Sequence, residues 1–134
     1  MALCVFDKNT RMMQYAGANR PLYIVQDANG ITELKEIKGD RMPLGYYSGK
    51  ERSFTNHEAR LEIGDAFYLF SDGFVDQKGG KGNKKYMSIN FKRLLLKINE
   101  QHMYDQQKTL EKELVEWMGN NPQVDDIMII GVRV

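Results

Sequence analysis

Short apolar runs divided by turn residues fill the first half of the chain, and they predict β-strands. Strands are expected at residues 2–6, 12–16, 21–26, 31–37 and 66–70, with a weaker strand region at 52–63. The apolar residues of 31–37 fall three apart, so periodicity alone leaves helix and strand open there. The Asn29-Gly30 pair just before that segment favours a hairpin turn, and therefore a strand.

The second half of the chain changes to a helical period. One helix face is marked by Phe91, Leu94, Leu95 and Ile98. A second helix is expected to begin with Asp105 as its N-cap and to end at Gly119 and Pro122. Its inner face would carry Leu110, Leu114, Trp117 and Met118. The glycine- and lysine-rich residues 77–83 predict a flexible loop, and residues 127–134 predict a closing strand.

Strands followed by helices and one last strand indicate an α+β fold, in which two helices cover one face of a mainly antiparallel sheet. The pattern leaves open whether a second sheet is present. A length of 134 residues suits a single domain, and 42% hydrophobic residues suffice for one core. Because Met1 leads directly into strand-like sequence, we expect the chain to be a piece of a longer domain.

Composition narrows the classes of partner. The 19 basic and 18 acidic residues balance, so nothing points to nucleic acid or an anionic membrane. No apolar stretch approaches the roughly 20 residues that cross a bilayer. The single cysteine, Cys4, cannot form an internal disulfide and lies in an apolar run, which favours a reducing cytoplasm.

Two acidic segments stand out at the ends of apolar strands. Ser71-Asp72-Gly73 directly follows residues 66–70, and Asp125-Asp126 directly precedes the last strand. Adjacent carboxylates repel each other unless a cation or a donor offsets their charge. If the two strands are neighbours, these hard oxygen ligands converge, as a Mg²⁺ or Mn²⁺ site requires.

Each acidic segment also has a plainer interpretation. An Asp-Gly pair after a strand is commonly a turn, and Asp125 could simply end a loop that starts at Pro122. The residues 16–21 form a tight turn whose Asn19 and Arg20 could face a site, although a plain turn is the simpler interpretation.

Other polar residues are weaker candidates. His57 and His102 lie in polar segments without the spacing of metal ligands, so we expect them on the solvated surface. Ser71 lacks the sequence elbow of a serine nucleophile. The glycines and lysines of residues 79–85 lack the spacing of a phosphate-binding Walker loop.

Several segments, taken together, resemble the SpoIIE-type branch of the metal-dependent, type 2C-like (PPM) protein serine/threonine phosphatases. They are YAGANRPLYI at residues 15–24, MPLG at 42–45, GDAFYLFSDGFVDQ at 64–77 and QVDDI at 123–127. Their order and spacing run through nearly the whole chain. The resemblance is greatest to the subgroup in which this module ends a larger sensor or signalling protein.

The resemblance implies an αββα fold of two packed antiparallel sheets flanked by helices, with a binuclear Mn²⁺ or Mg²⁺ centre. By motif match, Asp72 and Asp125 are the metal-binding, catalytic aspartates. Asp126 would support the site without binding metal directly, and Gly73 would let the chain pass close to the centre. The activity would be a hydrolase reaction in which metal-activated water removes phosphate from phosphoserine or phosphothreonine.

The resemblance also implies partners. A phosphoprotein would be the substrate, for example one of the anti-sigma-factor antagonist type, and sensor or signalling domains would lie upstream in the full-length protein. A cytoplasmic location follows, including the case of the cytoplasmic part of a membrane-anchored sensor. Exposed edges of a truncated sheet predict self-association into a dimer or larger assembly.

The chain departs from the family pattern in two places. The upstream D-x-x-G-H-G motif, which carries the other metal aspartates, does not occur in this sequence, and Lys78 stands where the family usually has phenylalanine. We therefore expect residues 1–134 to be the C-terminal part of a phosphatase domain and inactive alone. A non-catalytic regulatory or protein-binding module, or a small ligand-binding β domain with turn aspartates, are the alternatives.

Overall fold

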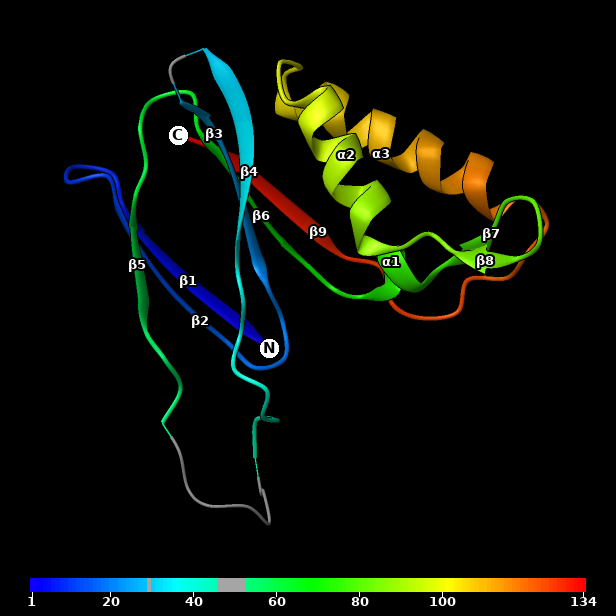
Figure 1. Ribbon diagram of the computed structural model, residues 1–134, viewed down its shortest axis with the longest axis horizontal. Coiled ribbons are helices and arrows are strands. Elements are labelled where there is room, and N and C mark those ends of the chain that lie inside the picture. The colour runs from blue at the N-terminus through cyan, green and yellow to red at the C-terminus, as the bar shows by residue number, and fades with distance from the viewer. Residues whose placement is uncertain (29, 46–52) are drawn as a thin grey trace.

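Two larger antiparallel sheets, a small two-stranded one and a layer of helices make up the computed structural model, which describes residues 1–28, 30–45 and 53–134 (Figure 1). The three-stranded sheet has the order β1-β2-β5, formed by β1 (Ala2–Asp7), β2 (Met12–Gly17) and β5 (His57–Arg60). The four-stranded sheet has the order β4-β3-β6-β9, formed by β3 (Leu22–Ala28), β4 (Ile31–Ile37), β6 (Ala66–Phe70) and β9 (Ile129–Arg133). The helices are α1 (Gly73–Asp76), α2 (Ser88–Ile98) and α3 (Met103–Met118).

The inner strand β3 begins with four apolar residues, Leu22 to Val25, because both of its faces are covered there. Leu22 and Ile24 belong to the core between the two sheets, together with Met13, Tyr15, Ile37, Leu61 and Phe67. Tyr23 and Val25 belong to the core between the four-stranded sheet and the helices. Successive strand side chains point to opposite faces, so each covered face needs its own set of apolar residues.

The helices cover the face of the four-stranded sheet that points away from the three-stranded sheet (Figure 1). The predicted face of α2 is buried as expected, through Phe91, Leu94, Leu95 and Ile98. Phe91 has ring centroids 5.0 Å from both Phe70 and Phe74, so the strand end, α1 and α2 share one aromatic cluster. This cluster anchors the segment that follows β6.

The α+β fold class and the mainly antiparallel sheets are confirmed, and the question of a second sheet is answered by β1, β2 and β5. The weaker strand region is shorter than predicted, at β5, and its first residue, Arg52, lies outside the described residues. Asn29 of the predicted hairpin turn also lies outside them, while Gly30 has the positive φ of 80° that such a turn needs.

Several predicted bounds differ from those of the structure. α3 begins at Met103 with His102 at the N-cap position, so Asp105 lies inside the first turn. β9 begins at Ile129, because Met128 just before it is hydrogen-bonded to Ser71, as described below. Residues 77–83 include β7 (Lys78–Gly79), which pairs with β8 (Lys84–Lys85).

The β7–β8 segment is ordered by one aromatic side chain. Trp117 donates from its indole nitrogen to the Gln77 carbonyl at 3.0 Å, and its own carbonyl accepts from Gly80 N–H at 2.9 Å. Glycine and lysine composition suggested mobility, but the glycines serve here to let the Trp117 side chain and backbone come close. Among the described residues, no helix combines the length and apolar character needed to cross a lipid bilayer.

Candidate metal centre

The two acidic segments lie at the same end of neighbouring strands. β6 and β9 pair antiparallel with Phe70 opposite Ile129, so the residues after β6 meet the residues before β9. The condition on which the sequence interpretation depends, that these two strands are neighbours, is therefore met. Both segments stand at the end of the four-stranded sheet beside α1 (Figure 1).

Ser71 ties the two segments together. Its backbone N–H donates to the Met128 carbonyl at 2.9 Å, and its hydroxyl donates to the Asp126 carbonyl at 2.6 Å. The same hydroxyl accepts from the Met128 N–H at 2.9 Å. The serine therefore replaces the strand ladder where β9 has not yet begun, and it fixes the spacing of the two loops.

Gly73 is required by the close approach of the two loops. A Cβ at this position would lie 2.3 Å from the Asp126 carbonyl oxygen and 2.8 Å from Ile127 Cγ1. No side chain fits such a gap unless the backbone moves. The glycine after Asp72 thus allows Asp126 to stand directly against the turn that carries the aspartate.

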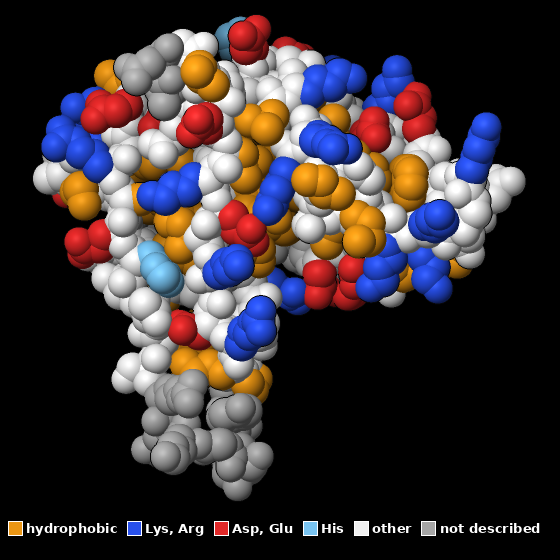
Figure 2. Space-filling view, viewed as in Figure 1, with side chains coloured by type: hydrophobic (Ala, Val, Ile, Leu, Met, Phe, Trp, Pro, Cys, Tyr) orange, Lys and Arg blue, Asp and Glu red, His pale blue; other side chains and the backbone are white. Residues whose placement is uncertain are grey.

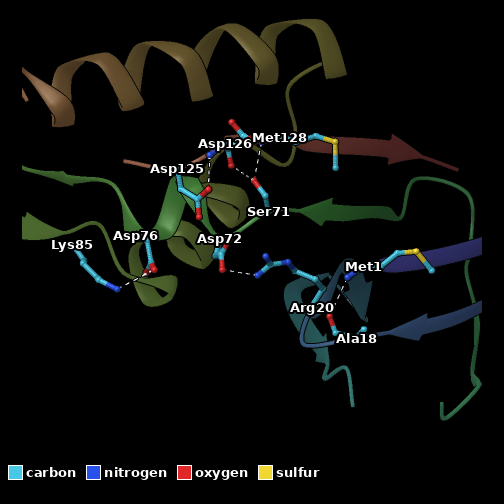
Figure 3. A network of polar contacts seen from close by, with 10 residues as sticks. All are labelled: Met1, Ala18, Arg20, Ser71, Asp72, Asp76, Lys85, Asp125, Asp126 and Met128. Atoms are coloured by element: carbon cyan, nitrogen blue, oxygen red, sulfur yellow. Dashed lines mark hydrogen bonds and ion pairs between the residues drawn. The ribbon is translucent and has the colours of Figure 1, made fainter. Parts of the chain in front are cut away.

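Asp72 receives a charged partner from another part of the chain. Arg20, in the turn between β2 and β3, donates from Nη1 to Asp72 Oδ2 at 2.6 Å (Figure 3). This charged hydrogen bond holds the pKa of the Asp72 carboxyl below its usual value, and partial burial opposes the shift. The carboxylate remains 41% exposed, so a ligand could reach it.

Asp125 and Asp126 are exposed and held mainly through their backbone. The Asp126 N–H donates to Asp125 Oδ1 at 2.7 Å, and Gln123 Nε2 donates to the Asp125 carbonyl at 2.7 Å. In Figure 3, Asp125, Asp126 and Ser71 gather in the same part of the view as Asp72. The structure therefore brings the two loops that carry Asp72, Gly73, Asp125 and Asp126 into backbone contact, with the Asp126 carbonyl against Gly73 and Ser71.

Arg20 is the residue whose role the sequence interpretation left open, because a plain turn was the simpler interpretation of residues 16–21. Its carbonyl accepts a hydrogen bond from the Tyr15 hydroxyl. Gly17 and Gly39 leave room for that same carbonyl, since a Cβ on either would lie 2.5 or 2.3 Å from it. The sequence signal for such an arginine is a short turn in which a glycine precedes the arginine and a proline follows it. This pattern could have indicated a rigid turn backbone from which the arginine side chain extends.

The weaker candidates lie elsewhere or are already engaged. His57 stands on β5 with its ring 6.2 Å from that of Tyr15, and His102 precedes α3. Lys85 pairs with Asp76 at 2.9 Å, and its charge adds to the lowering of the Asp72 pKa. None of these three joins the two aspartate loops through a hydrogen bond.

The residues fit part of a site for a hard divalent cation. Exposed carboxylate oxygens are the ligands that Mn²⁺ and Mg²⁺ prefer, and the Gly73 gap keeps the second loop close. Within the described part of the chain, however, no group of three or more His, Cys, Asp or Glu is placed to hold a metal. Asp72 and Asp125 could therefore supply only some of the ligands.

Comparison with known proteins gives a consistent result. The sequence model of the stage II sporulation protein E (SpoIIE) family matches residues 1–134. The chain is 34% identical to the SiaA-PP2C domain of Pseudomonas aeruginosa, with a TM-score of 0.87 over 99% of this chain and 50% of that one. No curated protein matches.

The Bacillus subtilis cell fate determinant SpoIIE shares the fold. Its PP2C phosphatase domain with a fragment of the regulatory domain is 18% identical, with a TM-score of 0.71 over 99% of this chain and 37% of that one. The Mn-presoaked phosphatase domain is 16% identical, with a TM-score of 0.69 over 100% of this chain and 56% of that one. The chain thus spans about half the length of the SiaA-PP2C domain that it matches.

Proposed function

The chain belongs to the SpoIIE family, and from that premise we propose that it forms part of a metal-dependent protein serine/threonine phosphatase. The observation that supports this proposal is the meeting of the Asp72 and Asp125 loops at one end of β6 and β9. Loss of phosphatase activity in an Asp72→Asn variant of the full-length protein tests it.

The chain's own residues would have distinct roles in this reaction. Asp72 and Asp125 would hold metal through their carboxylates, and Asp126 would support the site through its backbone carbonyl against Gly73. Two Mn²⁺ or Mg²⁺ ions, when bound, supply an activated water and offset the phosphoryl charge. Ser71 is unsuited as a nucleophile because its hydroxyl is engaged with Asp126 and Met128.

The substrate in this proposal is a phosphoserine or phosphothreonine protein in bacterial signal transduction, of the anti-sigma-factor antagonist type. Upstream sensor or signalling domains would control the reaction in the cytoplasm. One observation favours the alternative of a non-catalytic regulatory module, namely that the described residues lack a complete metal-binding group. Activity of the full-length protein that depends on Asp72 would separate the two functions.

The chain of residues 1–134 by itself is expected to be inactive. Two metal-binding carboxylates cannot fix two cations and a water in the way that a two-metal reaction needs. Hydrolysis of p-nitrophenyl phosphate with Mn²⁺ should therefore stay at the level of an Asp72→Ala control. Robust turnover that Asp72→Ala abolishes would show that this half of the domain is sufficient.

Self-association of the chain of residues 1–134 is expected because apolar side chains are exposed on the end strands of both sheets. Leu3 and Val5 on β1 are each 57% exposed, and Ile130 on β9 is 46% exposed. Figure 2 shows apolar side chains exposed among charged ones over both the sheet and the helix regions of one face. Light scattering should report a dimer or larger assembly that Val5→Lys weakens, and a strict monomer at high concentration would contradict this.

A further inference from the structure

The ion pair between Arg20 and Asp72 joins a residue of the proposed metal site to a positively charged side chain 2.6 Å away. Resting on the proposed function, we propose that Arg20 competes with the divalent cation for Asp72 and thereby sets the metal affinity of the site. The guanidinium donates to Oδ2 of the carboxylate at 2.6 Å. A cation on the same carboxylate would lie within a few ångströms of this charge, where like charges repel.

The backbone that carries Arg20 is held firmly. Its carbonyl accepts from the Tyr15 hydroxyl, and the glycines at 17 and 39 close around it. The neighbouring Asn19 N–H donates to the Asp40 carbonyl at 2.8 Å, and the Ala18 N–H donates to the Met1 carbonyl at 2.7 Å. The turn therefore directs the arginine stem toward Asp72 and leaves only the side chain free to exchange partners.

Stability does not account for this arrangement. The side chains of Arg20 and Asp72 are 33% and 41% exposed, and ion pairs with that much solvent contact contribute little to folding. The Ser71 and Gly73 contacts already fix the end of β6, and they do so without Arg20. If the ion pair had a purely structural role, replacing Arg20 would leave the metal affinity of the site unchanged. The two explanations therefore predict different results.

Mn²⁺ titration of the metal-free full-length protein by calorimetry tests the proposal directly. Arg20→Gln should bind Mn²⁺ about tenfold more tightly than the wild type, because a repelling charge beside the site is lost while solvent and salt limit the gain. Arg20→Lys keeps the charge and should stay within about threefold of the wild type. Arg60→Gln makes the same charge change on β5, where Arg60 pairs with Glu62, and should leave the affinity unchanged.

Equal or weaker Mn²⁺ binding in Arg20→Gln would overturn the proposal. Asp72→Asn in the same titration separates this failure from failure of the proposed function. If Asp72→Asn loses affinity while Arg20→Gln does not gain it, only the role of Arg20 is wrong. If Asp72→Asn binds as the wild type does, both proposals fail. Should Arg20→Gln not fold, Arg20→Met retains the apolar stem and answers the same question.

Discussion

Asp72→Asn in the full-length protein is expected to lower kcat/KM for a phosphoprotein substrate by at least about 100-fold. Loss of a partner that merely orients a metal-binding residue costs about 10- to 100-fold, so loss of the metal-binding carboxylate itself should cost more. Asparagine keeps the size of the side chain but removes the charge that would hold a cation. The variant should still fold, because the ion pair with Arg20 is largely exposed and contributes at most about 1 kcal/mol.

The expected loss is checked by measuring initial rates of phosphoprotein dephosphorylation by Asp72→Asn and the wild type with Mn²⁺. Thermal unfolding of both proteins is measured in parallel. Asp76→Asn is the matched control, since Asp76 lies four residues further along in α1 and pairs with Lys85 rather than with Arg20. Activity near the wild-type level in Asp72→Asn would remove the metal-dependent mechanism from this site. It would then favour the regulatory-module alternative.

Strands and helices could be predicted where one physical signal dominates. β3 and β6 are covered on both faces, so they are nearly continuous apolar runs that few other structures explain. α2 shows its buried face through four residues at helical spacing. The start of α3 could not be predicted, because Asp105 is a good N-cap by type and nothing local shows that the chain turns helical three residues earlier.

The β7–β8 segment shows a different limit. Its glycines and lysines have the composition of a mobile loop, and what orders it is Trp117, some 40 residues further along the chain. A contact of this kind depends on the packing of α3, which no local pattern contains. Composition therefore indicated flexibility where the fold supplies a specific partner.

The candidate site likewise has residues that the sequence predicts and a contact that it does not predict. The aspartates could be predicted because each lies beside an apolar strand, and the pairing of β6 with β9 brings them to one end. Arg20 was considered as a residue that could face a site, but its partner could not be predicted, since Arg20 is 52 residues from Asp72 and only the packing of the β2–β3 turn against the end of β6 joins them. The two acidic segments could be identified in the sequence, while the pairing of Arg20 with Asp72 could be identified only in the structure.

Among substitutions that add a single methyl group, Gly73→Ala is expected to disturb the candidate site most. The new Cβ would meet the Asp126 carbonyl oxygen at 2.3 Å, so the Asp72 and Asp125 loops would have to move apart. Overpacking of this kind costs about 1–3 kcal/mol, and here the strain falls on backbone that cannot rotate away. Urea unfolding of the full-length protein should report that loss together with weaker Mn²⁺ binding.

Gly79→Ala separates the two effects. Its Cβ would lie 1.9 Å from the Trp117 carbonyl oxygen, a comparable backbone clash against α3 instead of the Asp126 loop. This control should lose about 1–3 kcal/mol as well, yet keep Mn²⁺ affinity wherever it is folded. Equal Mn²⁺ affinity in folded Gly73→Ala and wild type would mean that the spacing of the two loops does not matter to the cation. Asp72 and Asp125 would then not share a centre, because a shared cation requires their carboxylates to keep a fixed separation.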